Sequence, residues 1–248
     1  DPVRQTRAKL GLPEQPTDVE LECIAQTWSE HCKHKIFAAR VHYVDEAGRE
    51  EWIDSLFKTC IRDATAKIGK EIDWLVSVFS DNAGIIRFNE HYNIAYKVET
   101  HNSPSALDPY GGAITGIVGV NRDPMGTGMG CEMLTNVWGY CLGSPFYSGD
   151  LPEGLMHPSR IRDGVHQGVI DGGNQSGIPY SRGFERFDER YIGKPLVYCG
   201  TVGRIPRVLQ ERPSERKEIA PGDLIVMCGG RIGKDGIHGA TFSSEELR

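Results

Sequence analysis

The run from Lys97 to Asn102 contains residue types that nucleotide chemistry requires. Lys97 and Glu99 occupy alternate positions of a β-forming segment, so their side chains should lie on one face of a strand. Arg122 and Asp123 add a second cation and a second carboxylate. Because carboxylates bind Mg²⁺ and cations bind phosphates, the set predicts a magnesium–nucleotide site. The spacing also fits a structural alternative, a salt-bridged strand end beside an Arg-Asp turn.

A second group of candidate residues, His31-Cys32-Lys33-His34, lies where a predicted helix ends. The group is compatible with a metal site or with a cysteine–histidine nucleophile pair. It is equally compatible with an ordinary helix C-terminus, where cationic side chains interact favourably with the helix dipole. Zinc is disfavoured because the other histidines and cysteines lack zinc-finger spacing.

Two glycine-rich segments depart from the known phosphate-binding motifs. Around 229–236, Cys228 stands where a Walker A loop needs its first glycine, and Asp235 stands where it needs Ser or Thr. Segment 126–130 lacks the preceding strand and the following acid of a dinucleotide-binding fingerprint. Backbone amides of either loop remain candidates for phosphate binding. A glutaminase nucleophile is disfavoured at Cys131, because methionines occupy the glycine positions of the nucleophile elbow.

The polar run needs a strand that ends beside it, and the sequence predicts one. Segments 73–79, 84–89 and 92–99 are rich in β-formers and are separated by turn residues, which indicates three consecutive strands. After a Pro-Tyr-Gly-Gly turn at 109–112, the small apolar residues of 113–120 predict a tightly packed helix or a close backbone contact.

Capping and periodicity predict the other elements. Thr17 and Glu20 form a capping-box pattern that begins an amphipathic helix, whereas residues 121–160 show no clear pattern. The predicted elements are a helix at 18–33, a strand and turn at 35–48, a helix at 52–67, a helix near 159–171, a loop at 172–177, a strand at 195–205, a turn at 220–223 and a buried strand at 224–228. We therefore expect an α/β fold, with domains at 1–194 and 195–248.

The composition is that of an ordinary globular protein, with 248 residues of which 39% are apolar and 25% charged. A formal charge of −6 without a basic cluster disfavours a nucleic-acid binder. No apolar run approaches the roughly 20 residues that span a bilayer, so we expect no membrane association and a cytoplasmic location. Seven scattered cysteines favour reduced thiols. Both ends of the chain resemble cuts from a longer protein.

Five motifs occur in a fixed order along the chain. They are Thr27-Trp28-Ser29-Glu30-His31-Cys32-Lys33-His34-Lys35, Lys97-Val98-Glu99-Thr100-His101-Asn102-Ser103-Pro104-Ser105, Pro109-Tyr110-Gly111-Gly112-Ala113, Arg122-Asp123 and Gly229-Gly230-Arg231-Ile232-Gly233-Lys234-Asp235-Gly236. Their order and intervals resemble those of the phosphoribosylformylglycinamidine synthase family. The resemblance runs from about residue 17 to the end and is looser over 121–195.

The resemblance implies an aminoimidazole ribonucleotide synthetase-like amino-terminal domain followed by the start of a second α/β domain. It implies that the whole enzyme makes formylglycinamidine ribonucleotide from formylglycinamide ribonucleotide, ATP and glutamine-derived ammonia in de novo purine biosynthesis. ATP would phosphorylate the amide oxygen, and ammonia would attack the resulting iminophosphate. The implied cofactors are ATP and Mg²⁺. The implied partners are a glutaminase subunit or domain and the remainder of the chain. The resemblance is also compatible with a homodimer.

The resemblance also assigns roles to individual residues. His31 and His101 match catalytic positions, with His101 as the proton acceptor. The other matched positions are His34 and Lys97 for ATP, Glu99 and Asp123 for Mg²⁺, and Thr100, Asn102, Ser103 and Arg122 for the substrate. Ser103 is a departure, because the family has a second histidine there.

Two further hypotheses come from the same residues. The chain is compatible with another ATP-using synthetase of the superfamily, of the aminoimidazole ribonucleotide or selenophosphate type. The Trp-Ser-Glu-His-Cys and Glu-Thr-His-Asn segments disfavour both types. The departure at Ser103 gives some weight to a second alternative, a catalytically degenerate scaffold half that only assembles or binds nucleotide. Because downstream family residues are missing, we expect the isolated chain to be inactive.

Overall fold

The computed structural model describes residues 2–27, 29, 31, 34–231, 233 and 239. The chain divides into two compact units, Asp1–Ala66 with Leu224–Arg248 (unit 1) and Lys67–Asp223 (unit 2). The elements of unit 1 are α1 (Pro2–Lys9), α2 (Asp18–Gln26), α3 (Lys35–Ala38), β1 (Arg40–Val44), β2 (Glu50–Asp54) and the π-helix η1 (Phe57–Arg62). Helix α4 (Asp63–Ile68) joins the two units.

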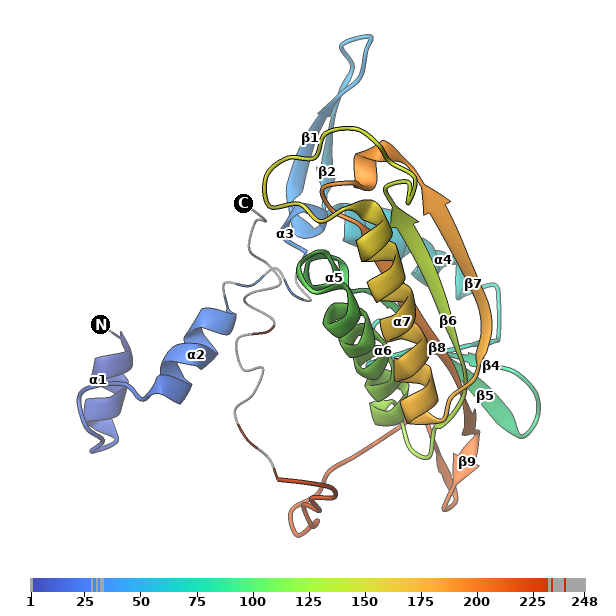
Figure 1. Cartoon of the computed structure of the whole chain (residues 1–248). Helices are drawn as coiled ribbons and strands as arrows, with labels where there is room; N and C mark the ends of the chain where they lie inside the picture. The colour runs from blue at the N-terminus through green and yellow to red at the C-terminus, as the bar shows by residue number, and fades with distance from the viewer. Residues whose placement is uncertain are drawn as a thin grey trace. The chain divides into compact units, whose positions relative to one another are not determined.

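Unit 2 contains a six-stranded sheet and the two longest helices, α6 and α7 (Figure 1). Its elements are β3 (Leu75–Ser77), β4 (Gly84–Arg87), β5 (Tyr92–Thr100), α5 (Asn102–Leu107), α6 (Pro109–Gly126), β6 (Glu132–Leu142), α7 (Pro158–Ser176), β7 (Tyr180–Phe187), the 3₁₀ helix η2 (Glu189–Tyr191), β8 (Leu196–Pro206), β9 (Val208–Leu209) and β10 (Arg212–Pro213). The larger sheet has the strand order β3-β4-β5-β8-β6-β7. All neighbouring pairs are antiparallel except β6 and β7, which α7 connects as a parallel crossover.

Helices α5, α6 and α7 lie on one face of this sheet, as Figure 1 shows. The core between the helices and the sheet consists of Ala113, Ile117, Val120, Tyr140, Leu142, Ile161, Val165, Val169, Val197 and Cys199. Burying each large side chain contributes about 1.5–3 kcal/mol relative to exposure. Glycines bring α6 and α7 close together, since a Cβ at Gly168 would lie 2.4 Å from the carbonyl oxygen of Tyr110. The arrangement confirms the predicted α/β class.

Several predicted elements are confirmed with small changes at their ends. The strand predicted at 92–99 is β5, and the strand predicted at 195–205 is β8. The segment 113–120 lies inside α6. The capping box at α2 is present, because the Thr17 hydroxyl accepts the N–H of Glu20 while the Glu20 carboxylate accepts the N–H of Thr17. Strand alternation, small-residue content and the capping box are local sequence features, so these elements could be predicted from the sequence.

The helix predicted at 52–67 is wrong in its first part. Trp52 lies in β2, where it pairs with His42 of β1 and stacks on its ring at a centroid distance of 4.5 Å. The Arg40 guanidinium lies 4.6 Å from the Trp52 ring centroid and extends the cross-strand contact. These contacts and the Asp45-to-Gly48 turn favour a hairpin over the helix that the apolar spacing suggests.

Two other predictions are also wrong. The loop predicted at 172–177 is helical up to Ser176, and Gly177 caps α7 with a φ of 68°. Packing outweighs the poor helix propensity here, because Gly172 lets α7 approach Ile117 of α6. The strand predicted at 224–228 is exposed and unpaired, since no strand among the described residues hydrogen-bonds to it.

The domain boundary expected between 194 and 195 does not coincide with the limits of unit 2. Strand β8 follows that position directly, yet it lies between β5 and β6 in the centre of the sheet. Removing β8 would leave β5 and β6 each without one of its two partner strands. Within this chain, residues 195–223 therefore belong to the same compact unit as the strands before them.

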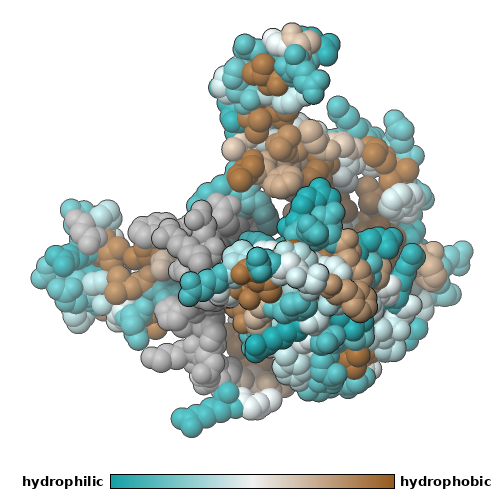
Figure 2. All heavy atoms as spheres, turned by 45° about the horizontal axis from the view of Figure 1, so that its top comes forward, coloured by the Kyte–Doolittle hydropathy of each residue, from teal (hydrophilic) through white to brown (hydrophobic). Residues whose placement is uncertain are grey.

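Apolar side chains are exposed in both units, and they form the brown areas of Figure 2. In unit 1 they include Leu21 of α2 and Trp52 of β2, and in unit 2 they include Phe146, which is 90% exposed. Across the described part of the chain, no helix is long and apolar enough to span a membrane.

Candidate active site at the end of strand β5

Strand β5 carries Lys97 and Glu99 on the face that α6 covers. A Cβ placed on Gly119 of α6 would lie 3.4 Å from the Glu99 carboxylate, and one on Gly116 would lie 3.0 Å from the His101 Cβ. The alternation predicted from the sequence is therefore present, and His101 continues it just past the end of β5. Small residues on α6 leave room for these polar side chains between helix and sheet.

Lys97 and Asp123 form an ion pair that joins β5 to α6. The Lys97 Nζ lies 2.8 Å from the Asp123 Oδ2, with side chains 28% and 22% exposed. Lys97 also donates to the backbone carbonyl of Asn82 at 3.2 Å, and the Asn82 amide donates to the Asp123 Oδ1 at 3.3 Å. The structure therefore brings together two of the predicted site residues. Since the pair is partly exposed, it can open toward a charged ligand at small cost.

The turn that contains Asn82 is itself fixed by Asp81. The Asp81 carboxylate accepts hydrogen bonds from the Gly128 N–H at 3.0 Å and from the Lys217 Nζ at 2.8 Å. Burial acts to raise the pKa of Asp81, but these hydrogen bonds and the Lys217 charge outweigh it and hold that pKa below its ordinary value. Asp81 is therefore an anionic anchor between the β3–β4 turn, the end of α6 and the segment after β10.

His101 has the properties of a neutral base. It lies at the N-terminal end of α5, half-buried against α6, and burial lowers the pKa of its imidazole. The Gly112 backbone acts on that pKa in the opposite direction without cancelling the effect of burial. The Nδ1 atom is buried and has no hydrogen-bond partner among the residues that the structure describes. An imidazole in this state can accept a proton from a reacting group at neutral pH.

The lowered pKa of His101 predicts a pH dependence of stability. The folded chain binds fewer protons at His101 than the unfolded chain, whose pKa is near 6.5. The associated stability is present above pH 6.5 and is lost as the pH falls through the lower pKa of the folded state. We expect urea unfolding to show a smaller loss of stability between pH 7 and pH 5 in His101→Asn than in the parent. Equal losses in the two proteins would contradict this account.

The carboxylates of Glu99 and Asp123 fit a magnesium ion that is held jointly with phosphates. Both flank the α6–β5 contact, Glu99 beside Gly119 and Asp123 one helical turn further along α6. Mg²⁺ usually takes one or two protein carboxylates and completes its shell with waters and substrate phosphates. No cluster of three or more His, Cys, Asp or Glu able to hold a metal occurs among the described residues. The donor set therefore suits this mode rather than an all-protein cage.

The four residues predicted to contact the substrate differ in their surroundings. Thr100 and Arg122 are exposed. The Asn102 side-chain oxygen accepts the Val197 N–H at 2.9 Å, so it ties α5 to the start of β8. Ser103 is only 5% exposed in the first turn of α5. Thr100 and Arg122 are thus available to a ligand as they stand, whereas Asn102 and Ser103 also serve the local fold.

His31 and His34 belong to unit 1 and are both exposed. The His31 N–H donates to the Ser29 hydroxyl at 3.0 Å. His34 has a left-handed backbone with φ 48° and precedes α3. Their neighbours Cys32 and Lys33 lie outside the described residues. The catalytic and ATP-binding roles assigned to these two histidines stay predictions.

The sequence did not reveal Asp81, Asn82 or Lys217 as members of this group. Asp81 and Asn82 were visible only as turn residues between two predicted strands. Lys217 lies far along the chain, so local spacing contains no signal for its contact with Asp81. Once the structure shows that the Asp81 carboxylate is mostly buried, a partner such as Lys217 is expected, because a buried charge is costly unless it is paired.

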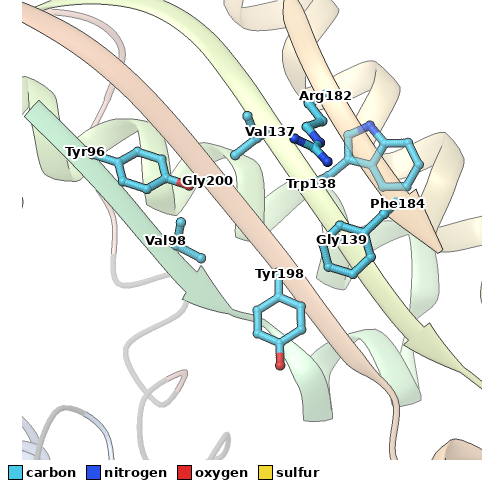
Figure 3. Close-up of a pocket in the computed structure, with 9 residues that line it drawn as sticks. All are labelled: Tyr96, Val98, Val137, Trp138, Gly139, Arg182, Phe184, Tyr198 and Gly200. Atoms are coloured by element: carbon cyan, nitrogen blue, oxygen red, sulfur yellow. The ribbon is translucent and has the colours of Figure 1, made fainter. Parts of the chain in front are cut away.

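An apolar hollow lies on the other face of the same sheet. Figure 3 shows its lining residues, Tyr96, Val98, Val137, Trp138, Gly139, Arg182, Phe184, Tyr198 and Gly200. Tyr96 and Val98 alternate with Lys97 and Glu99 along β5, so they point away from α6. The hollow is therefore separate from the polar candidate site.

Two thiols of unit 2, the half-buried Cys131 and the buried Cys199, lack the properties of a nucleophile. Burial raises the pKa of Cys131 to about 11 and that of Cys199 to about 12. A neutral thiol is neither a good nucleophile nor a good metal ligand. The polar cluster around Lys97 and His101 is therefore the better candidate for chemistry in unit 2.

Comparisons with known proteins identify the family of the chain. The family pattern "AIR synthase related protein, N-terminal domain" matches residues 80–205, roughly half of the chain's 248 residues. The chain belongs to this family of AIR synthase related proteins. The matched range contains Lys97, Glu99, His101 and Asp123. A second pattern, "Formylglycinamide ribonucleotide amidotransferase linker domain", matches residues 4–35.

Individual relatives define the likeness further. Phosphoribosylformylglycinamidine synthase subunit PurL of Thermoplasma acidophilum is 37% identical over 245 residues, which cover 99% of this chain and 28% of the relative. T. maritima PurL complexed with FGAR is 29% identical with a TM-score of 0.59, covering 97% of this chain and 31% of that one. T. maritima PurL complexed with ATP is 26% identical with a TM-score of 0.58, covering 96% and 32%.

These likenesses confirm the resemblance that the ordered motifs indicated, and they confirm the aminoimidazole ribonucleotide synthetase-like fold class. This chain spans less than a third of the length of these relatives.

Proposed function

We propose that this chain is the ATP-binding amino-terminal part of a phosphoribosylformylglycinamidine synthase. The observation that carries the proposal is the cluster of Lys97, Glu99, His101 and Asp123 between β5 and α6. It combines a phosphate-binding cation, two carboxylates for Mg²⁺ and a neutral base within one domain of the family. The PurL structures complexed with FGAR and with ATP support the substrate and the nucleotide.

The reaction requires activation of an amide, which is a poor electrophile. The amide oxygen of formylglycinamide ribonucleotide attacks the γ-phosphorus of ATP, and ADP leaves. Ammonia then attacks the carbon of the iminophosphate, and phosphate leaves to give formylglycinamidine ribonucleotide. Mg²⁺, when bound, neutralises charge on the transferring phosphoryl group.

The chain's own residues divide this work. Lys97, which pairs with Asp123 in this structure, would bind the ATP phosphates, and the carboxylates of Glu99 and Asp123 would hold Mg²⁺. His101 accepts a proton at its imidazole, which burial keeps neutral at pH 7. The exposed positions among Thr100, Asn102, Ser103 and Arg122 contact the substrate directly. His31 takes part in the catalysis and His34 takes part in ATP binding.

The proposal includes partners and a location. A glutaminase subunit or domain supplies ammonia, as the resemblance to phosphoribosylformylglycinamidine synthases implies. The rest of a longer chain completes the site, since the relatives extend well beyond the matched region. The enzyme works in the cytoplasm, where its nucleotide substrates are found, and it is compatible with a homodimer.

Removing the Asp123 charge should weaken binding of the magnesium–nucleotide. In the complete protein that carries this chain, we expect Asp123→Asn to raise the Kd of Mg-AMPPCP by about 10- to 100-fold, the usual effect of losing a metal ligand or its support. Calorimetry measures the Kd at a fixed free Mg²⁺ concentration. Asp163→Asn is the matched control, because Asp163 is an exposed acid on α7 with one arginine partner. If Asp123→Asn binds as tightly as the control, Asp123 is not a magnesium ligand.

A further inference from the structure

Asn82 contacts both members of the Lys97–Asp123 pair with different atoms. Its backbone carbonyl accepts a hydrogen bond from the Lys97 Nζ at 3.2 Å. Its side-chain Nδ2 donates a long hydrogen bond, 3.3 Å, to the Asp123 Oδ1. Lys97 occupies the other carboxylate oxygen, Oδ2, at 2.8 Å. The two oxygens of Asp123 therefore have separate partners, and only one partner is a mobile cation.

The position of Asn82 is fixed by its neighbour. Asp81 is held by the Gly128 N–H and by Lys217, and its side chain is only 12% exposed. Lys217 also donates to the carbonyl of Gly126 at the end of α6. The turn is thereby attached to the same helix that carries Asp123. This anchor restrains the backbone of Asn82 relative to Asp123.

These contacts determine what happens when Lys97 turns toward a phosphate. Asp123 then loses the cation at Oδ2, and a carboxylate without partners is free to rotate. The Asn82 amide still holds Oδ1, so Oδ2 keeps facing the space that Lys97 has vacated. We propose that Asn82 is a positioning residue, which orients the Asp123 carboxylate for Mg-nucleotide binding. This inference rests on the proposed function, because it takes Asp123 to be a magnesium ligand.

The chain offers a matched control in the next turn of the same sheet. Asn82 lies in the turn before β4, and Asn89 lies in the turn after it. The Asn89 side-chain oxygen accepts hydrogen bonds from the N–H groups of His91 and Tyr92 at 2.9 and 2.8 Å. No hydrogen bond of the Asn89 side chain reaches Lys97 or Asp123 among the described contacts. Asn89→Ala therefore removes turn hydrogen bonds without touching the ion pair.

The test is the binding of Mg-AMPPCP to the complete protein, measured by calorimetry over a range of free Mg²⁺ concentrations. We expect Asn82→Ala to raise the Kd by about tenfold at low Mg²⁺, as the loss of one hydrogen bond to a charged group predicts. We expect Asn89→Ala to stay within about twofold of the parent. An Asn82→Ala protein that matches Asn89→Ala at every Mg²⁺ concentration overturns the inference.

A double-mutant cycle separates positioning from a general effect on the fold. If Asn82 acts through Asp123, then Asn82→Ala should change the Kd by less than about twofold when Asp123→Asn is already present. A full tenfold effect in that background overturns the inference, because it would not depend on the carboxylate.

Binding and turnover also separate this inference from the proposed function. A parent protein that binds Mg-AMPPCP but does not convert formylglycinamide ribonucleotide overturns the proposed function, while the Asn82 and Asn89 comparison still decides the inference. A parent protein that binds no Mg-AMPPCP overturns both.

Discussion

Replacing His101 with asparagine should lower the turnover number of the complete protein by about 100- to 10,000-fold, the range that one general acid–base group contributes. Asparagine is polar and of similar size near the backbone, but it cannot accept a proton at neutral pH. The measurement is ADP release that depends on formylglycinamide ribonucleotide and ammonium. Binding of Mg-AMPPCP should stay within about threefold of the parent, because His101 is not proposed to hold the nucleotide.

The size of this effect follows from the environment of His101. Burial lowers the pKa of the imidazole, so the neutral form predominates at pH 7 and persists below pH 6.5. Its Nδ1 has no hydrogen-bond partner among the described residues, which leaves that atom without a structural role in this state. The turnover number of the parent should therefore decline with acidity only below the ordinary histidine pKa.

A second histidine controls for general effects of this substitution. His91 lies in the turn before β5, at the opposite end of the strand from His101, and its side chain is exposed. His91→Asn should leave the turnover number within about twofold of the parent, as is usual for a surface change. If His101→Asn and His91→Asn have the same activity, His101 has no part in the chemistry.

Replacing Gly112 with alanine should strongly destabilise unit 2. A Cβ at this position would lie 2.5 Å from the Pro104 carbonyl carbon and 2.5 Å from the Ser105 nitrogen. Both are backbone atoms of α5, so no side chain can rotate away. We expect a loss of about 3 kcal/mol in the free energy of unfolding, at the upper end of overpacking effects. For a unit of this size, the loss corresponds to a fall in Tm of about 10 °C.

The same helix provides the control for Gly112. Gly126 ends α6, has a negative φ, and a Cβ there would meet no atom within 4 Å. Gly126→Ala should leave the Tm unchanged or slightly raised, because alanine restricts the unfolded chain. Thermal unfolding of both variants checks the pair. A Gly112→Ala protein as stable as Gly126→Ala would show that α5 and α6 are not in the close contact described above.

Alternation along β5 was the part of the site that local sequence could predict. Lys97 and Glu99 share a face because successive side chains of a strand point in opposite directions. The partner of Lys97 could not be predicted in this way. Asp123 reaches Lys97 only because α6 packs across the sheet, and Asn82 joins them through a turn whose position depends on Asp81. Such contacts are set by tertiary packing, which residue spacing does not encode.

The wrong predictions have the same origin. Trp52 and Ile53 fit a helical spacing, yet cross-strand stacking on His42 places them in a hairpin. Gly172 and Gly173 suggest a loop, yet the absence of side chains is what lets α7 pack against Ile117 and Tyr180. In both cases a tertiary contact outweighs the local preference.

The ion pair between Lys97 and Asp123 unites the two hypotheses that the sequence left open. A salt bridge at the strand end was the structural alternative, and it is present at 2.8 Å. The same two side chains are partly exposed, and they share the contact between β5 and α6 with Glu99 and His101. A resting ion pair of this kind keeps both charges solvated and paired until a ligand competes for them.

The most direct test of the central proposal is ADP release by the complete protein with formylglycinamide ribonucleotide, ATP, Mg²⁺ and either ammonium or a glutaminase with glutamine. We expect the parent protein to release ADP only when both the ribonucleotide and the nitrogen source are present. We expect this release to be lost in His101→Asn. Binding of Mg-AMPPCP without any such release would contradict it, and would favour a scaffold that binds nucleotide without catalysis.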